Sequence, residues 1–155
     1  MGSLNIVLIE PEIPPNTGNI ARLCAATGAS LHLVKPLGFQ LDDKHLKRAG
    51  LDYWHMLDVH IYENFVEFET LRPQGIRYCA TTKAGRWYTD LTYQPGAYVL
   101  FGKETQGLAP EILTQYAATM MRLPMREGAR SLNLSNAVAV VAYEALRQWG
   151  FPGLL

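Results

Sequence analysis

Three short segments carry more hydrogen-bonding side chains than the turns and helix ends around them require. They are residues 16–22, 101–108 and 130–136, and each lies in a loop or helix start that follows an apolar, strand-like run. Open α/β sheets bind ligands beyond the carboxyl ends of their strands, so these segments are expected to meet there. Their glycines, amides, hydroxyls and basic groups predict a site for a ligand with polar and anionic parts.

The first segment, Asn16–Arg22, is expected to begin a helix. Asn16 or Thr17 is interpreted as its N-cap, because such side-chain oxygens accept hydrogen bonds from the first backbone N–H groups of a helix. Arg22 is followed by Leu23–Ala26 on an otherwise apolar helix. A guanidinium in such a place usually has a phosphate or carboxylate partner, although an exposed surface arginine is the plain alternative.

The second and third segments combine tight turns with polar side chains. Gly102 and Gly107 permit close backbone approach to a ligand, and Glu104 between them is an acceptor for adenosine, ribose or a cation. Ser131 and Asn133 lie where a helix starts, and the N-terminus of a helix attracts a carboxylate or phosphate. A flexible loop and a simple N-cap remain the alternatives for these two segments.

Several patterns of nucleotide and metal chemistry are absent. The chain has no G-x-G-x-x-G or G-x-S-x-G sequence, which argues against the usual dinucleotide-binding and α/β-hydrolase sites. Gly102 and Gly107 have the glycine spacing of a P-loop, but Leu108-Ala109 replaces the Lys-Ser/Thr pair that would hold a γ-phosphate. The histidines lack metal-ligand spacing and are interpreted as scattered surface or core residues. They are His32, His45, His55 and His60.

Apolar runs and helix-like stretches alternate along the chain. Strands are expected at Leu4–Ile9, Leu31–Val34, Val59–Tyr62, Ile76–Thr81, Tyr98–Phe101 and Met120–Leu123. Helices are expected from Asn16 to Thr27 with Gly28 after it, and at Asp42–Ala49, Asn64–Leu71, Pro110–Gln115 and Leu134–Trp149. This alternation predicts an α/β fold in which a mostly parallel sheet has helices on both faces.

The last helix is expected to be buried on every side. Residues Ala137–Ala142 leave it no polar face, and a helix that is apolar all round must be covered all round. At the end of a small chain this predicts a subunit interface in addition to the domain core. Val141 is expected to lie inside that seam.

Composition predicts one domain over residues 1–155, of which Met1–Ser3 are typical of an expression remnant. With 48% hydrophobic and 18% charged residues the chain is globular, and its longest apolar run, Ala137–Tyr143, is too short to span a membrane. Two isolated thiols, Cys24 and Cys79, indicate reduced core residues and a cytoplasmic location. The net charge of zero does not by itself indicate a nucleic-acid partner, so any RNA-binding surface must be local.

Taken together, the three segments resemble a known family. N-x-G-N-x-x-R, F-G-x-E-x-x-G-L and P-M followed by S-L-N-L-S-N-A are similar, in this order, to the three signature motifs of the SPOUT, or trefoil-knot, RNA methyltransferases. The short chain, together with Ile9–Asn16 and Arg48–Tyr53, most resembles the minimal subgroup without an added RNA-binding domain. That subgroup methylates the ribose of the wobble nucleotide (position 34, cytidine or modified uridine) of leucine tRNAs.

The resemblance implies 2′-O-methylation with S-adenosylmethionine, which becomes S-adenosylhomocysteine, and without a metal. It also implies a C-terminal knot over roughly residues 98–155 and a homodimer formed by the first and C-terminal helices. The residues implied to bind the cofactor are Ala80, Thr81, Gly102, Glu104, Gly107, Leu123, Met125, Ser131 and Leu132. The implied catalytic group is Arg22, supported by Asn16, Glu104, Ser131 and Asn133.

The same resemblance implies contacts with tRNA. Substrate contacts are expected from Arg22, Lys83, Arg130 and Tyr143. Of these, Arg22 and Tyr143 are expected to reach a ribose that is bound mainly by the other subunit. Further phosphate contacts are expected among Lys44, Lys47, Arg48, Arg86 and Arg126. Because a guanidinium has a pKa above about 12, Arg22 is expected to bind phosphate and stabilise the developing alkoxide rather than act as a base. Three alternatives remain: another tRNA or rRNA ribose as target, a non-catalytic RNA-binding or cofactor-sensing module, and a generic nucleotide-binding domain.

Overall fold

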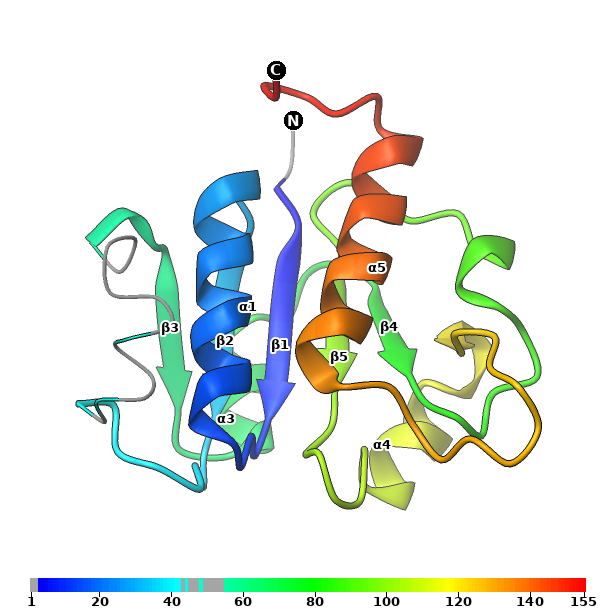
Figure 1. The fold of residues 1–155 in the computed structure, drawn as a ribbon, viewed down its shortest axis with the longest axis horizontal. Helices are drawn as coiled ribbons and strands as arrows, with labels where there is room; N and C mark the ends of the chain where they lie inside the picture. Colours follow the sequence, from blue (N-terminus) through cyan, green and yellow to red (C-terminus); the bar gives the residue numbers. More distant parts are fainter. Residues whose placement is uncertain (1–2, 43, 45–47, 49–54) are drawn as a thin grey trace.

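The sheet is six-stranded and every strand pair in it is parallel (Figure 1). The computed structural model describes residues 3–42, 44, 48 and 55–155. The strands are β1 (Asn5–Ile9), β2 (Ser30–Val34), β3 (Val59–Tyr62), β4 (Arg77–Ala80), β5 (Tyr98–Phe101) and β6 (Met120–Met121), in the order β3-β2-β1-β5-β4-β6. The predicted α/β fold with a parallel sheet is therefore confirmed.

Helices cover both faces of this sheet. On one face, α1 (Pro14–Thr27) and α5 (Leu134–Gln148) lie side by side, as Figure 1 shows. On the other face lie α3 (Phe65–Leu71) and α4 (Pro110–Gln115). The alternation along β1 explains the two cores, because Ile6 and Leu8 pack toward α1 and α5 while Val7 and Ile9 pack with the residues of α3 and α4. Two short 3₁₀ turns, η2 (Tyr88–Asp90) and η3 (Ala117–Thr119), join later elements.

The start of α1 differs from the expected cap. The helix begins at Pro14, its N-cap is Ile13, and neither Asn16 nor Thr17 caps it. Prolines in the first two helical positions fix φ in advance and have no N–H group to leave unpaired, so the helix can begin before the polar residues. The expected end is confirmed, because Gly28 adopts the left-handed conformation, with φ of 79°.

Most other boundaries agree with the sequence-based expectation. Asn64 caps α3, accepting the backbone N–H of Glu67 at 2.8 Å. Strand β6 is two residues shorter than predicted, and Arg122 beyond it forms only an isolated bridge with Trp87. The helix expected at Asp42–Ala49 and the motif at residues 48–53 lie largely outside the described residues.

Within one protomer, only one face of helix α5 is buried, and the covering of its other face by a second subunit stays a prediction. One face packs into the core through Val138, Val141 and Ala142, each 0% exposed, whereas Val140 is 40% exposed and Tyr143 44%. Val141 therefore belongs to the protomer's own core rather than to a seam between subunits. No helix in the described part of the chain is both long and apolar enough to cross a bilayer.

Both thiols are core residues, as expected. Cys24 is 1% exposed and Cys79 is 0% exposed, and neither forms a disulfide in the structure. Burial raises the pKa of each thiol to about 12. Because the thiolate is the reactive form, both side chains are expected to be chemically inert in the folded protein.

A buried polar network lies beneath α3, centred on His32. Its Nε2–H donates to Asn5 Oδ1 at 3.0 Å, and the Tyr62 hydroxyl donates to its Nδ1 at 2.8 Å, a pattern that fits the neutral imidazole. Arg72 Nε in turn donates to the Tyr62 oxygen at 2.9 Å, and the His60 ring stacks 4.9 Å away. Desolvation, helped by the nearby charges of His60 and Arg72, lowers the pKa of His32 to about 3.

This network predicts a pH-dependent stability. Between about pH 6.5 and 3 the unfolded chain binds a proton on His32 that the folded protein excludes, so the free energy of unfolding falls as the pH falls through this window. The loss at pH 5 is expected to be about 2 kcal/mol, measured by urea denaturation against pH 7.5. His32→Gln should remove this slope, and His55→Gln, which changes an exposed histidine, should keep it. An unchanged slope in His32→Gln would contradict the assignment.

Candidate functional site

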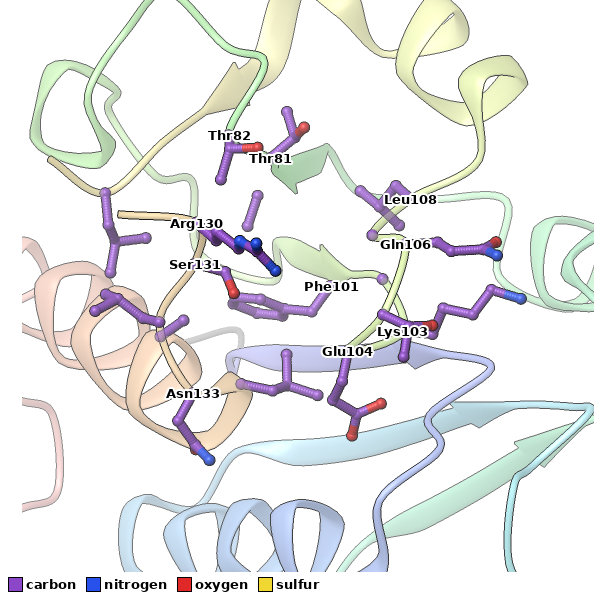
Figure 2. Close-up of a pocket in the computed structure, with 18 of the residues that line it drawn as sticks. Thr81, Thr82, Phe101, Lys103, Glu104, Gln106, Leu108, Arg130, Ser131 and Asn133 are labelled. Atoms are coloured by element: carbon purple, nitrogen blue, oxygen red, sulfur yellow. The ribbon is translucent and has the colours of Figure 1, made fainter. Parts of the chain in front are cut away.

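A cavity of about 590 Å³ opens beyond the carboxyl ends of the central strands (Figure 2). It lies where the strand order reverses, because the chain leaves β1 toward β2 on one side and leaves β5 toward β6 on the other. The crevice at such a switch point is the usual ligand site of an open α/β sheet. The walls come from the loops after β1, β4, β5 and β6 and from the start of α5.

The loop after β5 is closed on itself by its two glycines. A Cβ atom on Gly102 would lie 2.0 Å from the carbonyl carbon of Gly107 and 2.2 Å from the backbone nitrogen of Leu108. Gly107 has a φ of 71°, and its N–H donates to the Lys103 carbonyl at 2.8 Å. The predicted tight turn is confirmed, since any side chain at position 102 would force this wall of the cavity apart.

Glu104 ties this loop to the start of α1. One carboxylate oxygen accepts the backbone N–H of Glu12 at 2.8 Å, and the other accepts that of Ile13 at 3.2 Å. Glu12 reciprocates, accepting the N–H and hydroxyl of Thr105 at 3.1 and 2.8 Å, and these hydrogen bonds lower the pKa of Glu12. We call the contacts among these four residues the Glu12–Glu104 clamp. Both carboxylate oxygens of Glu104 thus accept hydrogen bonds from the protein itself, and these bonds hold the loop after β5 against the start of α1.

Two asparagines extend the clamp to the third segment. Asn16 donates from Nδ2 to Glu104 Oε1 at 3.4 Å, and Asn133 donates from Nδ2 to Asn16 Oδ1 at 3.0 Å. Asn133 also caps α5, because its Oδ1 accepts the backbone N–H of Ser135 at 2.9 Å. Asn133 is therefore a simple N-cap, as the alternative interpretation of this segment predicted, and it also connects the start of α5 to Asn16. One hydrogen-bonded chain therefore joins all three segments.

We expect Glu104→Gln to destabilise the protein. The amide NH₂ cannot accept, so at least one backbone N–H of the Glu12–Glu104 clamp loses its partner, at a cost of about 1–3 kcal/mol in the free energy of unfolding. Chemical denaturation measures this loss. Glu111→Gln, which changes an exposed carboxylate at the start of α4, is the control and should change stability by less than about 0.5 kcal/mol. Equal effects of the two variants would argue against the clamp.

The structure brings most of the predicted site residues to one cavity. All of the residues implied for the cofactor line it, as do Asn16 and Asn133, and so do the expected RNA contacts Lys83 and Arg130. Arg130 and Ser131 point into it in Figure 2. Sequence reasoning missed several other lining residues, and it also missed Glu12, which does not line the cavity but contacts Glu104 and Thr105 and had a readable signal as a carboxylate just before a helix. The missed lining residues include Ile13, Thr82, Phe101, Lys103 and Arg122.

Arg22 and Tyr143 do not line the cavity. Arg22 is exposed on α1 and Tyr143 is 44% exposed on the neighbouring α5. Each belongs to a stripe of exposed residues spaced by three or four, as one side of a helix requires. We call the two stripes together the outer face. It consists of Pro15, Asn19, Arg22 and Ala26 on α1 with Asn136, Val140, Tyr143 and Arg147 on α5.

The remaining basic residues lie in different places. Lys44, Arg48 and Arg126 are exposed, whereas Lys47 lies outside the described residues. Arg86 donates from its guanidinium to the backbone carbonyl of Ala118, so part of its donor capacity is already used by the protein. The predicted phosphate contacts at these positions stay predictions.

Comparisons with known proteins agree with this geometry. The family model for the SpoU rRNA Methylase family matches residues 3–143. A Yersinia pestis protein named tRNA (cytidine(34)-2′-O)-methyltransferase is 54% identical over an alignment of 159 residues that covers 98% of each chain. A solved structure described as giving insights into the 2-OH methylation of C/U34 on tRNA superposes with a TM-score of 0.91 at 42% identity, covering 96% of this chain and 97% of that one.

A more distant solved structure carries its ligand. It is an AdoMet-bound rRNA methyltransferase from Sinorhizobium meliloti, with a TM-score of 0.84 at 25% identity, covering 94% of this chain and 56% of that one. The expected resemblance to RNA methyltransferases is confirmed by the family match and by the identity along nearly the whole chain. On this basis, the chain belongs to the SpoU rRNA methylase family.

Proposed function

We propose that this protein uses S-adenosylmethionine to methylate the ribose 2′-oxygen of nucleotide 34, cytidine or modified uridine, in leucine tRNAs. One observation carries the proposal: three segments distant in sequence meet in a single hydrogen-bonded chain at the rim of one cavity. The wobble position is supported by the relative named for cytidine 34, which is 54% identical to this chain. The choice of leucine tRNA rests on the resemblance to the minimal subgroup, and a protein that methylates tRNA would act in the cytoplasm.

The cavity fits S-adenosylmethionine. Its volume of about 590 Å³ lies within the range of roughly 300–1,000 Å³ that small-molecule sites occupy. Backbone groups near Leu123, Met125 and Leu132 would hold the adenine. Because Gly102 has no side chain, the ligand can approach the backbone closely at this turn. The start of α5, which also lines the cavity, favours an anionic group such as the carboxylate of the ligand. The bound cofactor supplies an electrophilic methyl group, so the protein mainly has to position the two reactants and needs no metal.

Arg22 would act on the RNA rather than on the cofactor. Its guanidinium can bind the phosphate beside the target ribose and stabilise negative charge that develops on the 2′-oxygen. Asn16, Glu104, Ser131 and Asn133 would act by holding the loops and the start of α5 in place.

We further propose that the protein works as a homodimer in which the outer face is the seam. Arg22 and Tyr143 lie outside the lining of their own protomer's cavity, on a face that exposes Val140 beside them. A second copy packed on that face would carry its Arg22 toward the first copy's cavity, which makes the site composite. The trefoil knot over roughly residues 98–155 also stays a prediction from the family resemblance.

Mass spectrometry of nucleosides tests the proposal. The protein is incubated with isotope-labelled S-adenosylmethionine and separately with total tRNA and with rRNA, and the RNA is then digested. We expect labelled 2′-O-methylcytidine and 2′-O-methyluridine derivatives from leucine tRNA, mapped to position 34. Label in rRNA alone would favour the alternative target, and no label in either RNA would favour a non-catalytic module.

Calorimetry tests the ligand separately from the reaction. S-adenosylhomocysteine is expected to bind, whereas ATP and NAD are not, because the chain lacks the P-loop lysine and the dinucleotide fingerprint. Tight ATP binding without S-adenosylhomocysteine binding would overturn the assignment of the cavity.

A further inference from the structure

An exposed tryptophan stands beside the cavity and has no part in the site described above. Trp87 is 53% exposed and forms a parallel bridge with Arg122, which lines the cavity. The bridge is held by two backbone hydrogen bonds of 2.8 Å, from Tyr88 N–H to the Arg122 carbonyl and from Arg122 N–H to the Arg86 carbonyl. Side chains alternate between faces along a strand, so directly paired residues share a face. The indole of Trp87 is therefore the immediate neighbour of the Arg122 side chain.

The backbone that carries the indole is fixed on both sides. Trp87 N–H donates to Asp90 Oδ2 at 2.8 Å, and Asp90 N–H donates back to the Trp87 carbonyl at 2.9 Å. Trp149, the other tryptophan that the structure describes, is partly buried and donates its indole N–H to the Tyr93 carbonyl at 2.8 Å. Trp87 alone of the two offers a large aromatic surface to a partner, and it does so on a rigid support.

The cavity beside this aromatic surface carries positive charges, whereas the Asp90 carboxylate belongs to the support of the indole. Lys83, Arg122 and Arg130 all line the cavity, and none of them takes part in an ion pair within the described residues. Proteins that bind single-stranded nucleic acid combine such basic grooves with aromatic side chains on which bases stack. A partner protein would instead be expected to meet an apolar patch around the tryptophan, whereas the bridge partner of Trp87 is the cation Arg122.

We propose that Trp87 is a stacking site for the unpaired base next to the ribose that is methylated, with Arg122 contacting the phosphate between these two nucleotides. The inference rests on the proposed function for the identity of the RNA. It places the flanking nucleotide beside the cavity rather than inside it, because Arg122 lines the cavity and its bridge partner Trp87 does not. Trp87 would then contribute to RNA affinity and to the choice of the flanking base, and not to cofactor binding.

The kinetic test compares two substitutions at this position. Trp87→Leu removes the aromatic face and is expected to raise KM for tRNA about tenfold, with kcat and the Kd for S-adenosylhomocysteine nearly unchanged. Trp87→Phe keeps a stacking ring and should remain close to the wild type. Phe151→Leu removes another exposed aromatic side chain, 42% exposed and not among the cavity-lining residues, and should have no effect. Wild-type KM in Trp87→Leu, or equal loss in both Trp87 variants, would overturn the inference.

Fluorescence gives a readout that does not need methyl transfer. An anticodon stem–loop oligonucleotide should quench tryptophan emission of the wild type, and most of this quenching should disappear in Trp87→Phe, which retains the chain's two other tryptophans. If the wild type is quenched in this way but does not methylate tRNA, the stacking site stands and the proposed function fails. Quenching that persists in Trp87→Phe would overturn the stacking site while leaving the proposed function intact. A changed oligomeric state of Trp87→Leu in sedimentation would assign the indole to a contact between copies and would also overturn it.

Discussion

Arg22→Ala is expected to lower kcat for tRNA methylation by about 10²- to 10³-fold, the range found when a charge-stabilising donor is removed from an active site. The Kd for S-adenosylhomocysteine should stay within about twofold, because Arg22 does not line the cavity that would hold it. The residue is exposed on α1, and so the fold should also survive. Single-turnover assays with tRNA, together with calorimetry, measure both quantities.

Arg22→Lys separates the effect of the positive charge from the effect of the planar guanidinium. Lysine keeps the positive charge but loses the planar pair of donors that binds phosphate at two points, so its activity should fall between the wild type and Arg22→Ala. Turnover of Arg22→Ala at the wild-type rate would remove Arg22 from the mechanism. Loss of cofactor binding in the same variant would show a structural role instead.

Val140→Glu is expected to split the proposed dimer and abolish methylation without unfolding the protomer. Val140 is 40% exposed in one protomer, so a carboxylate there remains hydrated in the monomer. Inside a seam, an unpaired carboxylate would cost several kcal/mol, which weakens association by about a thousandfold or more. Val141→Glu gives the contrast, since Val141 is 0% exposed in the core and its replacement should unfold the protomer itself.

Sedimentation velocity and circular dichroism separate these two outcomes. The expected results are a folded, inactive monomer for Val140→Glu and an unfolded chain for Val141→Glu. A wild-type protein that sediments as a monomer at micromolar concentration with full activity would overturn both the dimer and the composite site.

Mixed dimers test the composite site directly. Gly102→Ala should damage the cavity, because its Cβ would lie 2.0 Å from the backbone of Gly107, while Arg22→Ala leaves the cavity intact. If Arg22 serves the cavity of the other subunit, a mixed dimer of the two inactive variants contains one complete site and should regain activity. Two inactive variants that stay inactive after subunit exchange, with exchange shown by mass spectrometry, would place Arg22 in its own protomer's site.

The sequence by itself determined most of the secondary-structure elements and which three segments would meet. Apolar runs of strand length and local end signals such as Asn64, Pro110 and Gly28 depend on neighbours a few residues away, so their structural consequences are readable along the chain. The three polar segments were readable for the same reason, and their convergence followed from the rule that parallel strands end at one edge. The residues that line the shared cavity came instead from the family resemblance, and the structure brings them together.

Only the tertiary structure decided how these parts are held. Glu104 accepts the N–H of Glu12 from 92 positions away, and the contacts of Asn16 with Glu104 and Asn133 make Asn16 a link in the site instead of the expected cap. The packing of α1 against α5 likewise decided that Val141 is core and Val140 is surface. Local sequence reports which groups need a partner, but contacts across a sheet edge or between helices choose that partner, and those contacts exist only after the chain has folded.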